Sequence, residues 1–399
     1  MRATRGLFLV SVVLVPVLAF AQRVVIEPEA FDRAAQVVEV TLHDPAPTHA
    51  VVRGSDGRIH PAHSKQSGHF QFLVEAQKAG ETLTFDIVAG SQAVNDQVVV
   101  NQGEKAIHVS SDGQRMLSYQ SAITSDLRSG IDPIYYRSGY LHPIFTPAGK
   151  IVTDDYGERN THQHGIWTAW SRTEFQGRSP NFWDPKPGTG RIEFDRVERV
   201  WNSSIASGFR VRHRYLDLQA PEGKRIALYE TWDVQVLPLV TVDGSQAHVF
   251  DIIVTQNCAT DDPLIVGEYR YGGLGVRGRS DWLKRENMRV LTDRGETDRV
   301  KANAQKTRWV VLGGVADGGQ AAIALLDHPG NFRSPQAVRV NENLPFICYA
   351  PTQEGAWRIE PGKPYVARYR VVVEDQVPAQ ERVEAFWRGY ATAPRVSVR

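Results

Sequence analysis

The sequence contains little cysteine: Cys258 and Cys348 are the only two in 399 residues. Neither lies in a Cys-x-x-Cys or beside a histidine, so the spacing argues against a thiolate metal site and against a cysteine nucleophile. In an oxidising compartment the two thiols could form a disulfide, because exported proteins tend to keep such bonds. They could equally remain two small hydrophobic side chains, since separation in sequence does not fix the Cα distance that a bridge requires.

An excess of charge is also absent. The chain has 46 basic and 45 acidic residues, with no basic patch or stripe of the kind that nucleic-acid binding requires. No apolar run after residue 21 approaches the roughly 20 residues that span a bilayer. We therefore expect no nucleic-acid partner, and no membrane insertion once the N-terminal segment has been removed.

Several common catalytic motifs do not occur. The sequence has no G-x-S-x-G elbow, Walker phosphate loop, H-E-x-x-H or S-x-x-K. These absences argue against the commoner hydrolase and nucleotide-dependent classes. There is no internal repeat of fixed period and no low-complexity segment either.

Residues 1–21 have the pattern of a secretory signal peptide. Arg2 and Arg5 precede an apolar segment that runs from Leu7 to Phe20, and Ala19-Phe20-Ala21 is an A-x-A cleavage site. We expect the mature chain to begin at Gln22 and to be periplasmic or secreted.

The rest of the chain has the pattern of an all-β protein. Short segments that alternate apolar with polar predict a small N-terminal β-sandwich module over residues 22–109. Longer alternating segments, such as Phe209 to Leu218 and Ile226 to Val236, predict a large two-sheet β-sandwich over residues 110–399. One C-terminal helix is expected after Pro378, where Ala379, Val383, Phe386, Trp387 and Tyr390 form one apolar stripe.

The densest collection of chemically active side chains lies between Ser138 and Trp183. It contains His142, two adjacent acids at Asp154 and Asp155, and the sequence T-H-Q-H-G with His162 and His164. On an extended strand the two-residue spacing would place His162 and His164 on one face. With His142 they could bind a divalent metal, completed by Asp154, Asp155 or Glu268. Alternatively, one histidine acts as general acid or base without a metal, or the histidines only tie loop backbone together.

Two other stretches and two aromatic side chains are candidate substrate contacts. E-Y-R-Y-G-G-L-G-V-R-G-R packs acid, tyrosine and arginine around four glycines, whereas D-H-P-G-N-F-R follows an apolar strand. In the alternative interpretation the first is a hairpin with solvated arginines and the second caps a turn. Trp167 and Trp170 could stack on a sugar ring, or could equally lie in the core.

These stretches together resemble an exported bacterial family usually called methane oxygenase PmoA-like. The resemblance rests on Y-L-H-P-I-F-T-P-A-G, T-D-D, H-Q-H-G-I-W-T-A-W, Y-G-G-L-G-V-R and D-H-P-G-N-F-R, in that order. Gln163 is a departure, because many members have consecutive histidines there. The resemblance implies a sandwich similar to galactose-mutarotase-like supersandwich domains, in which a cleft binds sugar. Methane oxidation by a membrane subunit does not fit a chain whose only long apolar segment is a cleavable signal.

We therefore expect an enzyme that acts on a carbohydrate or related polyol by histidine and carboxylate chemistry, of the epimerase, lyase or hydrolase type. A non-catalytic carbohydrate-binding protein and a histidine-site metalloprotein are the alternatives, and the sequence does not decide whether a divalent metal is bound. The expected catalytic residues are His162, His164 and Glu268. The expected substrate contacts are His142, Asp155, Trp167, Trp170, Arg270, Tyr271, Arg277, Asp327, His328 and Asn331.

Overall fold

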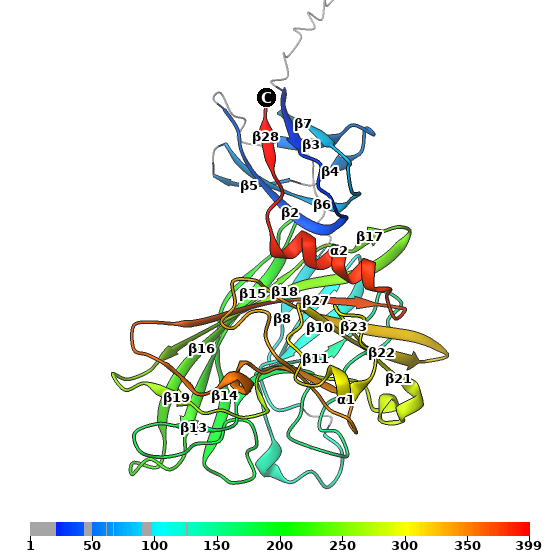
Figure 1. Cartoon of the computed structure of the whole chain (residues 1–399). Helices are drawn as coiled ribbons and strands as arrows, with labels where there is room; N and C mark the ends of the chain where they lie inside the picture. The colour runs from blue at the N-terminus through cyan, green and yellow to red at the C-terminus, as the bar shows by residue number, and fades with distance from the viewer. Residues whose placement is uncertain (1–20, 44–49, 61, 67, 90–97, 125–126) are drawn as a thin grey trace, which may run out of the picture.

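The computed structural model describes residues 21–43, 50–60, 62–66, 68–89, 98–124 and 127–399 (Figure 1). The all-β prediction is confirmed, because the described chain consists mainly of strands in antiparallel sheets. Residues 1–20 of the expected signal peptide lie outside the described residues. Within the part that is described, no helix is long and apolar enough to cross a membrane.

The N-terminal module is a sandwich of two small sheets. Its core is formed by alternate strand residues such as Val24, Phe72 and Phe85, all buried. The five-stranded sheet consists of β28 (Val396–Val398), β1 (Ala21–Ile26), β7 (Leu83–Ala89), β3 (Ala50–Gly54) and β4 (Ile59–His60), in that order. The three-stranded sheet consists of β2 (Arg33–Thr41), β6 (His69–Gln77) and β5 (Ala62–Gln66).

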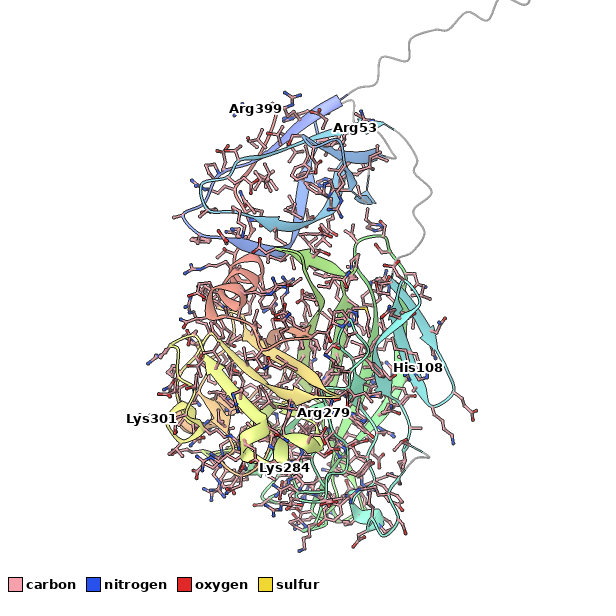
Figure 2. All side chains as sticks on the ribbon, turned by 90° about the vertical axis from the view of Figure 1, so that its right-hand side faces the viewer. Arg53, His108, Arg279, Lys284, Lys301 and Arg399 are labelled. Atoms are coloured by element: carbon pink, nitrogen blue, oxygen red, sulfur yellow. The ribbon has the colours of Figure 1, made fainter. Side chains whose placement is uncertain are left out.

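The C-terminal strand completes this module. β28 pairs antiparallel with β1, so that Val396 lies opposite Ile26 and Val398 opposite Val24. In Figure 2, Arg399 accordingly lies with Arg53 in the N-terminal module, far from Arg279 and Lys284 of the large sandwich. Three residues at the far end of the sequence carry no local signal of this pairing, and the sequence analysis did not anticipate it.

The large sandwich consists of an eight-stranded and a nine-stranded sheet. The eight-stranded sheet has the order β24 (Val338–Val340), β25 (Phe346–Tyr349), β20 (Gly272–Arg277), β12 (Ile166–Trp170), β11 (Tyr140–Ile144), β10 (Gln114–Gln120), β9 (Ala106–Ser111) and β8 (Val98–Gln102). The nine-stranded sheet has the order β14 (Gly190–Trp201), β15 (Ser207–Asp217), β16 (Arg225–Val236), β18 (Ser245–Cys258), β27 (Tyr365–Glu374), β23 (Gly319–Asp327), β22 (Trp309–Ala316) and β21 (Met288–Thr292), with β17 (Val240–Val242) beside β18.

β8 and most of β9, at one edge of the eight-stranded sheet, come before the domain boundary expected at residue 109. β8 pairs with β9, and β9 with β10, so residues 98–109 share a sheet with the large domain. The alternating pattern of these strands suits either sandwich, because period-2 alternation identifies a strand but not its partner.

Smaller elements complete the large domain. A three-stranded sheet contains β13 (Thr173–Glu174), β19 (Leu264–Val266) and β26 (Trp357–Ile359). The short helices are η1 (Pro133–Tyr135), η2 (Ser280–Leu283), η3 (Arg285–Asn287), η4 (Pro351–Glu354) and α1 (Arg299–Ala302).

The predicted C-terminal helix is α2 (Gln380–Ala391), which lies between the module and the large sandwich (Figure 1). Val383 and Phe386 of its apolar stripe are buried against the outer face of the nine-stranded sheet, where they meet Trp309, Leu326 and Val372. An apolar stripe at helical spacing is the pattern expected of a helix that packs on a sheet in this way.

The two cysteines are free thiols, Cys258 on the nine-stranded sheet and Cys348 on the eight-stranded sheet. Cys348 is fully buried and Cys258 is partly buried. Of the two alternatives left open by the sequence, the structure shows small hydrophobic side chains rather than a bridge.

Candidate functional site

The candidate site lies on the face of the eight-stranded sheet that points away from the nine-stranded sheet. Leu141 of β11 pairs with Ile166 of β12, and both are buried in the core of the sandwich. Because side chains alternate along a strand, Tyr140, His142 and Trp167 point to the opposite, outer face. Three strands thus present polar and aromatic groups together on that face.

Backbone hydrogen bonds at Arg277 join the two segments that carry the candidate residues. Its N–H donates to the carbonyl of Gly165 at 2.8 Å, and its carbonyl accepts from Asp154 N–H at 3.0 Å. Gly165 is required here, because a Cβ at this position would collide with the carbonyl oxygen of Leu141. The T-D-D and H-Q-H-G motifs, which are distant from the Y-G-G-L-G-V-R motif in sequence, are thereby adjacent in space.

His164 and Asp155 form a buried pair at the centre of the site. Asp155 Oδ1 lies 2.6 Å from His164 Nδ1, and the Tyr140 hydroxyl donates to Asp155 Oδ2 at 2.6 Å. An ionised carboxylate can only accept, so Nδ1 carries the proton and Nε2 is left with a lone pair. Burial lowers the pKa of His164 well below its ordinary value, and burial raises the pKa of Asp155 to about 6. Near neutral pH the pair is therefore a neutral imidazole oriented by a carboxylate.

The other two histidines are also kept neutral by burial. His142 Nδ1 lies 2.9 Å from Thr153 Oγ1, and burial lowers the pKa of His142. His162 lies in a turn before β12, with Nδ1 3.9 Å from Asp184 Oδ1, and burial lowers its pKa to about 4. The expectation that His162 and His164 share the face of an extended strand was wrong in its local structure, because His162 precedes the strand.

The described residues do not support the metal alternative. Nowhere among them do three His, Cys, Asp or Glu side chains come together in a way that could hold a metal ion. His142, His162 and His164 are all among the described residues. These residues do not fit a three-histidine metal site, so no step of the proposed chemistry uses one.

Arg277 is fully buried behind the histidines, where it fixes the residue between them. Its Nη1 donates to Gln163 Oε1 at 3.0 Å, and its Nε lies 3.7 Å from Asp154 Oδ2. Gln163, the departure from the histidine run of the resembled family, therefore accepts a hydrogen bond from a buried arginine. Arg277 and Gln163 together hold the H-Q-H turn in place.

The other residues of the glycine-rich stretch differ in exposure. Glu268 and Arg270 are exposed, and the guanidinium of Arg270 lies over the Tyr271 ring at 5.3 Å. Tyr271 is half-buried and its ring lies 5.6 Å from that of Trp183. The carboxylates beside the site histidines are thus Asp155, hydrogen-bonded to His164, and Asp184, 3.9 Å from His162, whereas Glu268 lies in an exposed segment before β20.

The two candidate tryptophans point to opposite faces of β12. Trp167 is on the outer face, with ring centroids 5.2 Å from Trp183 and 5.6 Å from Phe346. Trp170 points into the sandwich and donates from Nε1 to Gln256 Oε1 at 2.8 Å. The core alternative therefore holds for Trp170, because its ring is buried between the two sheets.

The D-H-P-G-N-F-R stretch forms a turn at the end of β23. Asn331 donates to Asp327 Oδ1 at 2.8 Å, and Ser334 donates to Asp327 Oδ2 at 2.7 Å. The Gly330 N–H donates to His328 Nδ1 at 3.0 Å. These contacts match the turn-capping alternative, although burial raises the pKa of Asp327 to about 6.

A narrow pocket opens beside His162 and His164, and we call it the histidine pocket. Its cavity volume is about 20 Å³, roughly the room that one ordered water needs. The sequence analysis missed most of its other lining residues, which are Tyr135, Tyr136, Arg137, Phe182, Trp183, Pro185, Gly190, Arg191 and Ile192. Arg137 could have been noticed, because it directly precedes S-G-Y-L-H-P, whereas Arg191 lies on a distant strand that only the fold brings here.

A polar network in the core lies behind the site. Glu230 of β16 is buried, and its carboxylate meets Thr168 of β12, His213, Tyr215, Trp232 and Gln256 at distances between 2.6 and 2.9 Å. Hydrogen bonds of this kind to the charged form lower the pKa of Glu230 despite its burial. The network fixes β12 from its inner side, opposite Trp167.

Comparison with known proteins gives little information about function. No curated protein matches the sequence. Among solved structures, an alpha-mannosidase from Enterococcus faecalis V583 is similar with a TM-score of 0.37 and 10% identity, over 95% of this chain and 46% of that one. A glycosyl hydrolase family 38 protein from Enterococcus faecalis gives a TM-score of 0.35, 11% identity, and 95% and 47% coverage.

The alpha-galactosidase from Lactobacillus brevis is less similar, with a TM-score of 0.25, 9% identity, and 69% and 39% coverage. The chain thus spans less than half the length of these enzymes. Similarity of this degree carries no conclusion about substrate or reaction. A comparison with protein families gives a match over residues 106–388, which contain every residue of the site described above. The chain therefore belongs to DUF6807, a family of unknown function.

Proposed function

We propose that this protein is an exported enzyme that acts on a carbohydrate or related polyol, with His164 as its general base. The observation that carries the proposal is the buried Asp155–His164 pair, which lines the histidine pocket through His164. A general base must be neutral at the working pH and must keep one nitrogen free to accept a proton. Burial supplies the first condition and the hydrogen bond to Asp155 supplies the second.

Each residue of the pair has a separate part in this chemistry. Asp155 holds the imidazole in one tautomer and stabilises the imidazolium that forms when Nε2 takes a proton from the substrate. Tyr140 donates to the second oxygen of Asp155 and so fixes the carboxylate plane. His162, also in the histidine pocket and neutral, can donate an N–H to a substrate hydroxyl or carbonyl.

The substrate class rests on the mixture of groups around the pocket. Tyr135, Tyr136 and Trp183 offer aromatic surface next to polar side chains, and sugars present apolar C–H faces and polar edges in the same way. The sequence resemblance to the PmoA-like family, and the galactose-mutarotase-like fold that it implies, support the same class. Export to the periplasm or the medium, proposed from residues 1–21, fits the processing of external carbohydrate.

Solvent proton exchange tests the acid–base function before the full reaction is known. The mature chain is incubated in D₂O with a panel of aldoses, ketoses, lactones and sugar acids, and NMR follows deuterium entry at carbon and any new species. We expect exchange or conversion with at least one compound, and a loss of about 10²-fold or more in His164→Asn, as for removal of a general base. His108→Asn is the matched control, because His108 is exposed on β9 of the same sheet.

The alternatives give different results in this experiment. A panel member that binds tightly but shows no exchange or conversion would favour a non-catalytic binding protein and contradict the role of His164. Stoichiometric zinc, copper, iron or manganese that is lost in His164→Ala would contradict the metal-free mechanism. Exchange that persists unchanged in His164→Asn would place the base elsewhere.

A further inference from the structure

The histidine pocket is lined by two arginines that form no ion pair within the described chain. Its lining residues include two arginines and two histidines but no aspartate or glutamate. Within the described chain, neither Arg137 nor Arg191 has a carboxylate within ion-pair distance. Asp155 lies behind His164, and Asp184 contacts His162 at 3.9 Å rather than either arginine.

Arg137 is held rigidly but is incompletely hydrogen-bonded. The Tyr156 hydroxyl accepts from its backbone N–H at 2.9 Å, and Arg137 Nη2 donates to the carbonyl of Thr168 at 3.1 Å. Its buried Nε has no hydrogen-bond partner among the described residues. A guanidinium remains charged in proteins even where burial lowers its pKa, as it does for Arg137. A buried donor that is left unpaired costs about 1–3 kcal/mol, which a ligand oxygen could recover.

Two other arginines of the chain show what a satisfied guanidinium looks like here. Arg370 makes two hydrogen bonds to Asp251, at 2.7 and 2.9 Å, and Arg210 makes two to Asp233, at 2.6 and 2.9 Å. Arg277, next to the site, has Asp154 beside it at 3.7 Å, although its Nε and Nη2 form no hydrogen bond among the described residues. Arg137 differs from Arg370 and Arg210 because it forms no ion pair within the described chain; the carboxylates of Glu230 and Asp155 act on it only from beyond ion-pair distance.

Arg191 adds a second positive charge from another sheet. It is the second residue of β14, at the edge of the nine-stranded sheet, and its side chain is half-buried in the histidine pocket. No hydrogen bond or ion pair involves its guanidinium in the described structure. Arg137, from the loop before β11, and Arg191, from β14, thus both line the pocket that holds the proposed base.

We infer that the histidine pocket binds a carboxylate, so that the substrate is an acidic sugar such as a uronate rather than a neutral one. The inference rests on the proposed function and narrows its substrate class. Guanidinium groups bind carboxylates through paired, charge-assisted hydrogen bonds. The pocket is too narrow to enclose a whole sugar ring, so the carboxylate is the part of the substrate that would enter it. A carboxylate held by two arginines also disperses negative charge that develops when His164 removes a proton from the adjacent carbon.

Matched acid and neutral sugars test the inference directly. Isothermal titration calorimetry of the mature chain with D-glucuronate, D-galacturonate, their methyl esters, D-glucose and D-galactose should show at least tenfold tighter binding of one free acid. Raising the salt concentration should weaken binding of that acid and leave the affinity for the esters unchanged, because salt screens the pairing of charges. Equal affinity for an acid and its ester would overturn the inference, as would a panel in which no acid binds.

Variants locate the carboxylate. Arg137→Gln and Arg191→Gln should each weaken binding of the acid at least fivefold and leave binding of the neutral sugar unaffected. Arg196→Gln, which changes an exposed arginine of β14 outside the pocket, should not weaken binding of the acid. Arg191 is half-buried, so its variant keeps the test valid if Arg137→Gln fails to fold. If acetate or sulfate binds as tightly as the uronate, the site recognises any small anion and the assignment to an acidic sugar is overturned.

Failure here and failure of the proposed function are distinguishable. If a uronate binds through Arg137 and Arg191 but shows no deuterium exchange, the proposed enzymatic function is wrong and the inferred carboxylate site is retained. If exchange occurs only with neutral sugars, the inferred carboxylate site is wrong and the proposed enzymatic function is retained.

Discussion

Replacing Glu230 by glutamine should destabilise the large sandwich by about 1–3 kcal/mol, the cost of leaving one buried donor unpaired. Each carboxylate oxygen accepts three contacts: Thr168, His213 and Trp232 at one, and Thr168, Tyr215 and Gln256 at the other. In the glutamine variant an amide NH₂ replaces one of the two carboxylate oxygens. Its N–H groups then face neighbours that are themselves hydrogen-bond donors. The hydroxyls can rotate, but the Trp232 N–H cannot, and each buried donor left unpaired costs about 1–3 kcal/mol.

Urea unfolding followed by tryptophan fluorescence measures this loss in the right domain. All 9 tryptophans lie at or after Trp167, so the signal reports on the large sandwich and not on the N-terminal module. Glu198→Gln is the control, because Glu198 is exposed on β14 and its ion pair with Arg196 should contribute less than about 1 kcal/mol. If the unfolding midpoints of the two variants coincide, the network around Glu230 does not stabilise the sandwich and the reasoning is wrong.

Three further predictions concern other parts of the molecule. Proton exchange by the wild type should rise with pH through about 6, because Asp155 must be ionised to hold the Nδ1 proton of His164 and burial raises its pKa to about 6; a flat profile between pH 5 and 7 would contradict this role. Truncation after residue 394 should expose the edge of β1 and speed proteolysis of the N-terminal module, measured against the full chain by limited trypsin digestion and mass spectrometry. Thiol titration should find two free thiols in the denatured, unreduced chain, and slow reaction of Cys348 in the native one, because it is fully buried; a count of zero would show that Cys258 and Cys348 are bridged.

Much of the fold could be predicted because its elements carry strong local patterns. The alternation in Ile226 to Val236 predicted β16, whose buried and less buried residues alternate in the structure. The stripe from Ala379 to Tyr390 predicted α2 to within a residue at each end. The pairing of β28 with β1, and of β8 with β9, could not be predicted, because partner choice depends on contacts between residues distant in sequence.

The site could be predicted in part for the same reason. His164 and Asp155 were recognised because imidazole and carboxylate occur close together in sequence, and the structure places them 2.6 Å apart. Arg191 and Glu230 lie on strands whose alternating pattern is ordinary, and only the packing of the two sheets makes them neighbours of the site. The role expected for Trp170 depended on which face of β12 it occupies, and that required the register with β20.

The strand formed by residues 396–398 pairs with β1, so the N-terminal sheet depends on a segment that is synthesised much later. During synthesis the strands β1 to β7 emerge first, but one edge of the five-stranded sheet stays open until residues 396–398 are made and cover β1. An open edge is a site for pairing with other chains, so the emerging protein would need a chaperone or rapid completion to avoid misassembly. The same connection means that the module cannot be exchanged between proteins as an N-terminal cassette alone, because a recombinant lacking residues 396–398 would carry an incomplete sheet.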